Sequence, residues 1–289
     1  MNINLIGRRK VWYIISLLII IPGIFSLFIQ GLNLGIDFTG GNLIQVKFEQ
    51  NVTSAQVRNV FSEHVKEGIS VQETDNNNFL IRTPVLTEEQ GAQVISSLTS
   101  QLGKNEILRN ELVGPLIGKE LALNALYALA IASVLMVVYI TFRFEFKFAL
   151  AAIAALLHDV LIVVVLFSIF QIEIDSAFVA AILTIIGYSV NDTIVVFDRI
   201  RENLRGNKKE DRELLVNRSV IQTLSRSINT VLTTLFPLIA LLLFGGATIK
   251  VFALALLIGI TSGCYSSIFI ASPLWLDLSK RLGERKARA

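Results

Sequence analysis

A few polar side chains lie inside long apolar runs, and their residue types could do chemistry there. Asp192 and its neighbour Asn191 lie in the run GYSVNDT, which has apolar residues on both sides. His158 and Asp159 lie near the middle of another apolar run. A charged side chain at the centre of a membrane-spanning helix costs about 2.5–3.5 kcal/mol, so charged residues kept in such places usually serve a function. These four residues are therefore candidates for ion binding.

A stripe of polar residues further along the chain includes a cation. Its members fall at helical spacing and therefore share one face of a helix. They are Thr223, Arg226, Thr230, Thr233, Thr234 and Pro237. Asp192 and Arg226 flank the same charged loop, so they can approach one another on antiparallel neighbouring helices. Burial disfavours a charged carboxylate and a nearby cation favours it, so a carboxylate under both influences can take up and release a proton.

These residues together predict an ion pathway through the membrane. Its predicted members are Asp192, Arg226, His158, Asp159, Asn191 and Thr230. Two alternatives remain open at this point. Threonine and asparagine side chains in membrane helices often only bond one helix to the next, so the threonine stripe is also compatible with simple packing. His158 and Asp159 are likewise compatible with a static hydrogen-bonded pair.

Several other kinds of site lack support in the residue pattern. Cys264 is the single cysteine, so an internal disulfide is excluded, and there is no cluster of Cys and His at zinc spacing. We therefore expect no metal and no cofactor. No phosphate-binding loop, nucleophile elbow or catalytic triad pattern is present, so we do not expect an enzyme. No basic patch with interleaved aromatic residues suggests nucleic acid as a partner.

The elements that must position these residues are membrane-spanning helices. The chain is 53% hydrophobic and 17% charged, whereas an ordinary soluble domain carries about 25% charged residues. Six apolar runs approach the roughly 20 residues needed to cross a bilayer. They are Val11–Ile29, Leu121–Ile140, Phe148–Phe170, Ala177–Phe197, Ile228–Phe244 and Val251–Leu276. The first is too long for a signal-peptide core, so we expect a retained helix. Between the fourth and fifth runs we expect a longer, charged connection over residues 198–227, with the fifth helix extending back toward Arg226.

Basic residues predict the orientation of these helices. Seventeen Lys and Arg residues fall on one side, in residues 8–10, 143–147, 199–218 and 280–288, whereas the short connections on the other side contain only Lys250. Segments that remain in the cytoplasm carry an excess of Lys and Arg. We therefore expect both termini in the cytoplasm, with residues 277–289 as a basic tail and residues 121–276 as a bundle of five helices after the first (residues 1–30).

Residues 31–120 are polar and predict a small extracytoplasmic domain. Ile44, Val46 and Phe48 alternate with polar residues as in a strand, and Thr53 and Thr87 each begin a capping box before a helical pattern. Further strand candidates lie at residues 70–73, 79–82 and 107–113. The resulting order is strand, helix, strand, strand, helix, strand. This order is typical of an α+β ferredoxin-like fold.

Four segments resemble the SecD/SecF family of protein-export membrane proteins. They are Gly35–Gly41 (GIDFTGG), Val113–Pro115 (VGP), the pair His158–Asp159, and Gly187–Asn203 (GYSVNDTIVVFDRIREN), which closely resembles the fourth helix of the SecF branch. Their order, together with six spans, makes the resemblance specific across nearly the whole chain. The glycines of the first segment also have a simpler explanation, a tight exit from the membrane into a strand.

The resemblance implies a function and partners. It implies an auxiliary subunit in the cytoplasmic (inner) membrane that works with SecD and the SecYEG channel and uses the ion-motive force to move preproteins outward. The family belongs to the resistance-nodulation-division superfamily, in which Asp192 and Arg226 match residues of the proton path. A further family carboxylate lies in SecD, and both protons and sodium remain possible as the coupling ion. Two rival hypotheses are half of a small-molecule exporter and a non-conducting membrane scaffold.

Overall fold

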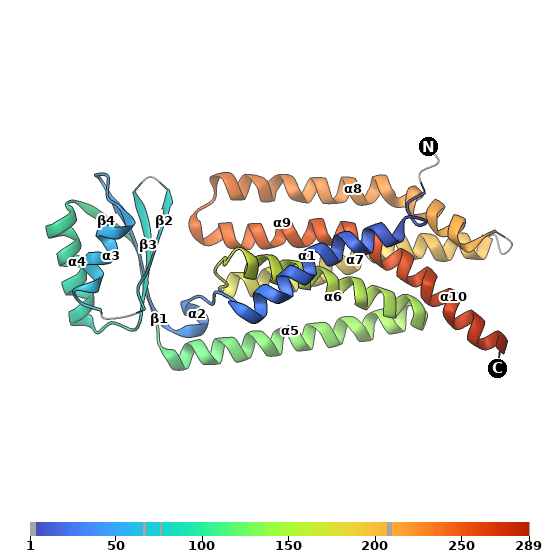
Figure 1. The fold of residues 1–289 in the computed structure, drawn as a ribbon, viewed down its shortest axis with the longest axis horizontal. Coiled ribbons are helices and arrows are strands. Elements are labelled where there is room, and N and C mark those ends of the chain that lie inside the picture. Colours follow the sequence, from blue (N-terminus) through green and yellow to red (C-terminus); the bar gives the residue numbers. More distant parts are fainter. Residues whose placement is uncertain (1–3, 66–67, 76, 207–209, 289) are drawn as a thin grey trace. The chain divides into compact units, whose positions relative to one another are not determined.

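The computed structural model describes residues 4–65, 68–75, 77–206 and 210–288. The chain forms two compact units. A helical unit contains Met1–Asn33 and Ala128–Ala289, and a unit with a β-sheet contains Leu34–Tyr127. The boundary falls within one long helix, α5 (Pro115–Arg143). Figure 1 labels the elements of both units.

Long helices build the helical unit. Besides α5 they are α1 (Arg9–Ile29), α6 (Phe146–Ile169), α7 (Ser176–Gly206), α8 (Arg212–Phe244), α9 (Ala247–Ser266) and α10 (Ser272–Arg288), with a π-helical turn η1 (Ser267–Ala271) between the last two. In the described part of the chain, six helical segments are long and apolar enough to cross a membrane, and the last of them runs continuously through α9, η1 and α10. The prediction of six spans is confirmed.

The predicted charged connection over residues 198–227 is wrong for most of its length. Helix α7 continues to Gly206 and α8 begins at Arg212, with the Asp211 carboxylate accepting hydrogen bonds from the first backbone N–H groups of α8. Apolar side chains continue at helical spacing beyond the long apolar runs, and Leu215 and Val216 are buried. Charged residues occupy the outward faces of these extensions, which made them resemble a loop. Lys208 and Lys209, two of the predicted cytoplasmic cations, lie outside the described residues.

Glycines allow close approach between the helices. A Cβ atom on Gly23 of α1 would lie 2.2 Å from Val165 of α6, and one on Gly259 of α9 would lie 2.2 Å from Ile185 of α7. One turn further along α9, a Cβ on Gly263 would lie 3.2 Å from Ser189. Small residues four apart let the backbones of membrane helices pack closely. This contact of α7 with α9 brings their polar residues together.

Ion pairs tie the basic ends of the helices to one another. Arg9 at the start of α1 pairs with Glu213 of α8 at 3.3 Å and with Asp277 of α10 at 3.1 Å. Lys280 also reaches Glu213, and Arg143 of α5 reaches Asp198 of α7, both at 3.3 Å. Basic residues that are far apart in the sequence therefore lie at one end of the bundle.

The second unit contains a four-stranded antiparallel sheet. Its elements are α2 (Ile36–Thr39), β1 (Gly41–Phe48), α3 (Ser54–Ser62), β2 (Ser70–Asp75), β3 (Asn78–Thr83), α4 (Glu88–Leu102) and β4 (Asn105–Val113). The strand order is β2-β3-β1-β4. Buried side chains of β1 and β3, such as Val46 and Phe79, pack with Val57 of α3 and with Leu98 of α4 in one core. Both capping boxes, at Thr53 and Thr87, are confirmed.

The segment Gly35–Gly41 contains a short helix, α2, before β1 begins. Gly40 and Gly41 have φ values of 74° and 133°, in the region that side chains with a Cβ rarely adopt. A Cβ on Gly41 would also lie 2.5 Å from the Thr83 carbonyl oxygen of β3. The two glycines therefore permit the turn from α2 into the sheet.

Candidate functional site

Asp192 is buried between α7 and α8. Its side chain is 7% exposed, and Ser227 of α8 donates a hydrogen bond of 2.7 Å to its Oδ1 atom. Its other oxygen, Oδ2, is buried and accepts no hydrogen bond within 3.5 Å among the described atoms, although the Ser267 side chain also lies near this carboxylate. A buried acceptor left without a partner typically costs about 1–3 kcal/mol, and more when it is charged. This oxygen is therefore an available site for a proton or a cation.

Arg226 precedes Ser227 and lies on the neighbouring helix, as the sequence predicted. It is exposed on this chain, and among the described residues it forms no ion pair with Asp192. Asn191 and Thr230 are exposed as well. Arg226 is thus the chain neighbour of Ser227, the serine that binds Asp192. The charged groups of Arg226 and Asp192 do not contact each other directly.

Exposed polar side chains continue along the outer faces of α7 and α8. Tyr188 of α7 donates its hydroxyl to the Thr230 carbonyl oxygen at 3.0 Å and lies 3.1 Å from the Thr234 hydroxyl. We call the exposed part of this surface the polar face. It consists of Thr184, Asn191, Arg226, Thr230 and Thr233. Lipid cannot satisfy such side chains, so polar groups at this depth must face protein or water.

His158 and Asp159 form a different group, on the opposite side of α7 from the polar face. Asp159 is fully buried, and its carboxylate accepts hydrogen bonds from Ser189 of α7 and from Ser262 and Ser266 of α9, at 2.6–2.7 Å. The His158 Nδ1 atom lies 3.0 Å from Asp159 Oδ1, and its Nε2 atom lies 2.9 Å from the Ser16 hydroxyl of α1. The predicted site residues thus fall into two groups, one at α7 and α8 and one at α1, α6, α7 and α9.

Six serines at these groups were not predicted from the sequence. They are Ser16, Ser189, Ser227, Ser262, Ser266 and Ser267. A signal was present in the last span, where serines at positions 262, 266 and 267 interrupt an apolar run at helical spacing. The acidic residues are conspicuous in an apolar run because of their charge, whereas the serine donors carry none.

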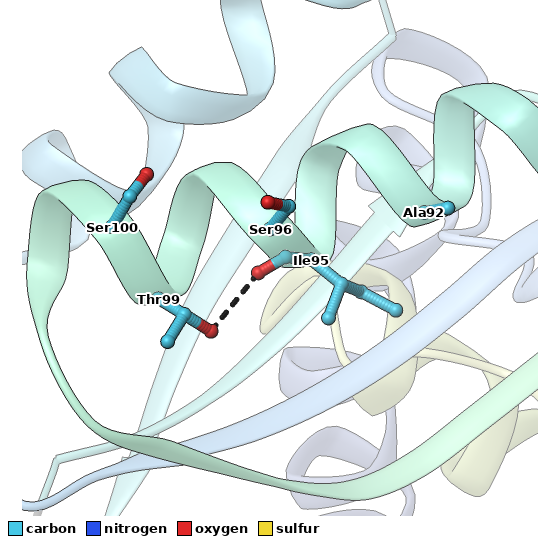
Figure 2. Close-up of a pocket in the computed structure, with 5 residues that line it drawn as sticks. All are labelled: Ala92, Ile95, Ser96, Thr99 and Ser100. Carbon is cyan, nitrogen blue, oxygen red and sulfur yellow. Dashed lines mark hydrogen bonds between the residues drawn. The ribbon is translucent and has the colours of Figure 1, made fainter.

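Two hollows among the described residues are open to their surroundings. A cavity of about 350 Å³ between α1, α6 and α9 has mostly apolar walls and touches His158 and Ser262. Figure 2 shows a hollow on α4 whose lining residues all come from that one helix: Ala92, Ile95, Ser96, Thr99 and Ser100. One helix face cannot enclose a ligand. Among the described residues, no group of three or more His, Cys, Asp or Glu side chains lies close enough together to hold a metal ion.

Comparisons with known protein families match two parts of the chain. Residues 93–281 match the family described as protein export membrane protein SecD/SecF, C-terminal. Residues 25–52 match the SecD/SecF GG motif, which includes the Gly40–Gly41 turn.

Individual relatives cover nearly the whole chain. The chain is 46% identical to the protein translocase subunit SecF of Sebaldella termitidis over 95% of its length and 91% of that protein. It is 47% identical to SecF of Acidaminococcus fermentans over 96% of this chain and 98% of the relative. It is also 43% identical to protein translocase subunit SecDF of Bacillus subtilis, covering 93% of this chain and 37% of that longer protein.

A solved structure shares the fold. The crystal structure of SecDF, a translocon-associated membrane protein from Thermus thermophilus, is similar with a TM-score of 0.90 and 38% identity, over 97% of this chain and 39% of that one. The chain therefore spans less than half the length of the fused relatives. The family match over residues 93–281 and the SecF relatives that cover almost all of the sequence show that this chain belongs to the SecF family of protein translocase subunits.

Proposed function

We propose that this chain works with SecD and uses the ion-motive force to promote preprotein movement through the SecYEG channel. The single observation that carries the proposal is the buried, unpartnered Oδ2 atom of Asp192. A proton or cation bound there changes the charge of the bundle. If two arrangements of the helices interact differently with that charge, the change of charge shifts the equilibrium between them. The shift is as large as the difference between the two interaction free energies.

The ion path proposed here runs along Asp192, Asn191, Arg226 and Thr230. Asp192 is the group that binds the ion, and Ser227 fixes its carboxylate by bonding Oδ1. Arg226 supplies a positive charge on α8, next to Ser227. This charge attracts the Asp192 carboxylate when the carboxylate is ionised, and the attraction is lost when the carboxylate is neutral. Asn191 and Thr230 provide oxygen atoms beside that route.

SecD is the proposed cover of the polar face. An arginine exposed to lipid would carry a cost of about 2.5–3.5 kcal/mol at the centre of a span, and this cost is removed when a partner helix supplies an acidic or polar group. The relatives named SecDF support this choice, because the chain corresponds to only 37–39% of their length. We infer that a separate SecD takes the place of the remaining part of the fused SecDF chain and covers the polar face.

The proposed placement follows from the basic residues. We infer a multi-pass protein of the cytoplasmic membrane, with both termini in the cytoplasm. Arg9, Arg143 and Lys280, from three parts of the chain, all lie in ion pairs at one end of the bundle, and an excess of basic residues marks the cytoplasmic side. We also propose that the β1-α3-β2-β3-α4-β4 unit is an extracytoplasmic domain of the ferredoxin-like class, because its strand order and antiparallel pairing are compatible with that fold.

Reconstituted vesicles test this function. The chain is placed in vesicles with the SecYEG channel, either alone or with SecD, and preprotein movement is measured with and without an imposed ion gradient. We expect the gradient to accelerate movement only when SecD is present, because the polar face is then covered and the path complete. Equal acceleration without SecD would contradict the proposed partnership, and no acceleration with SecD would contradict the proposed use of the gradient.

A further inference from the structure

The buried carboxylates of Asp192 and Asp159 differ in the number of hydrogen-bond partners that their oxygens have. Asp192 Oδ1 has one partner and Oδ2 has none. Asp159, in contrast, has two partners on each oxygen: His158 Nδ1 and Ser262 on Oδ1, and Ser189 and Ser266 on Oδ2. An ionised carboxylate offers about four lone-pair positions. Asp159 therefore has no free position for a further donor or a cation.

The partners of Asp159 hold its carboxylate from three helices. His158 Nδ1 of α6 lies 3.0 Å from Oδ1, and the hydroxyls of Ser189 of α7 and of Ser262 and Ser266 of α9 lie 2.6–2.7 Å from the two oxygens. The carboxylate is therefore fixed in position and joins α7 to α9.

We propose that Asp159, whose two oxygens already have two partners each, positions the Asp192 site through Ser189, Ser266 and Ser267, and that it does not carry the transported ion. The proposal rests on the proposed function of Asp192. It assigns Asp159 and its serines as positioning residues, and it gives His158 and Asp159 a different role from the ion conduction expected from the sequence.

The first route from Asp159 to Asp192 follows α7. Ser189 bonds Asp159 Oδ2 at 2.6 Å and lies three residues before Asp192, nearly one helical turn away. Ser189 is 2% exposed and packs where Gly263 lets α9 approach. This bond fixes the rotation of α7 about its axis and therefore the direction in which Asp192 points.

The second route follows the last span. Ser266 bonds Asp159 Oδ2 at 2.6 Å, and the next residue, Ser267, lies 2.8 Å from the hydroxyl of Thr193, which follows Asp192. The π-helical turn η1 begins at Ser267, and the Ser272 hydroxyl donates to the Ser267 carbonyl oxygen at 2.9 Å. Single π-turns inside α-helices are frequent at functional sites. Asp192 is thus held on both sides along α7, by Ser189 before it and by Thr193 after it.

Infrared difference spectroscopy of the chain purified with SecD tests the proposal. As the pH is lowered, a carboxyl group that takes up a proton gains a C=O stretching band. We expect Asp192→Asn to remove one such band from the spectrum of the parent complex. We expect Asp159→Asn and Ser266→Ala to retain that band but to shift its frequency, because the surroundings of Asp192 change. Loss of a titrating band in Asp159→Asn, with the Asp192 band unchanged, would overturn the proposal by making Asp159 a carrier.

Export measurements with a matched serine control complete the test. Ser279→Ala removes a buried hydroxyl that has no hydrogen-bond partner among the described atoms, so we expect it to behave as the parent in both assays. Ser266→Ala should lower gradient-stimulated export several-fold at equal protein level. Parent-like export and an unshifted band in Ser266→Ala would overturn the positioning role. Full gradient stimulation in Asp192→Asn would instead refute the proposed function on which this inference rests, so the two failures are distinguishable.

Discussion

Ser227 of α8 donates a hydrogen bond of 2.7 Å to Asp192 of α7, and this bond occupies one carboxylate oxygen while the other stays buried without a partner. The relationship orients the carboxylate and leaves its second oxygen without a hydrogen bond. It also joins the two helices whose outer surfaces carry Arg226 and Asn191. A change in the charge of Asp192 therefore acts directly on the contact between α7 and α8.

Arg226 is expected to act through its positive charge. We predict that Arg226→Ala lowers gradient-stimulated export strongly, whereas Arg226→Lys retains a larger part of it, because no bidentate contact of this arginine is found among the described residues. Arg218→Ala is the matched control, since Arg218 pairs with Glu210 at the basic end of the bundle. Equal losses in the alanine and lysine variants would show that the guanidinium geometry is required.

The orientation of the chain is testable with single cysteines in a Cys264→Ser background. Ser96 is an exposed residue of α4, and Glu202 is an exposed residue near the end of α7. We expect Ser96→Cys in intact cells to react with an impermeant thiol reagent and Glu202→Cys to react only after the membrane is opened. The opposite pattern of labelling would reverse the proposed topology.

The close contact of α9 with α7 predicts a stability effect. A Cβ on Gly259 would lie 2.2 Å from Ile185, whereas a Cβ on Gly187 would meet no atom within 4 Å. Overpacking a well-packed contact typically costs about 1–3 kcal/mol. We therefore expect Gly259→Ala to lower the midpoint of thermal unfolding of the detergent-purified chain, while Gly187→Ala leaves it unchanged. Equal midpoints for both variants would contradict the close packing at Gly259.

Much of this architecture was predictable because hydropathy and local hydrogen bonding determine it. The six spans follow from apolar runs, and the capping boxes at Thr53 and Thr87 depend on residues only three apart. The proximity of Asp192 to α8 also followed from two antiparallel helices that are consecutive in the chain. The ends of α7 and α8 were not predicted, because charged outward faces concealed the buried Leu215 and Val216.

The side chains that surround Asp159 could not be predicted from the sequence. Its donors come from Ser189, thirty residues away, and from Ser262 and Ser266, more than one hundred residues away. Helical periodicity shows which residues share a face of one helix, but not which face of another helix packs against it. The sequence therefore could not show which donors surround Asp159, on which the proposed positioning role depends.

The most direct test of the central claim compares preprotein export with and without an imposed ion gradient, in Asp192→Asn and in the parent, at matched levels of this chain and SecD. Asparagine keeps the size of the side chain and a carbonyl oxygen that can accept the bond from Ser227, but it cannot take up and release a proton at neutral pH. The account predicts that the variant inserts and assembles with SecD, keeps its export without a gradient, and loses the acceleration by the gradient. Normal acceleration in Asp192→Asn would contradict the account and favour a non-conducting scaffold.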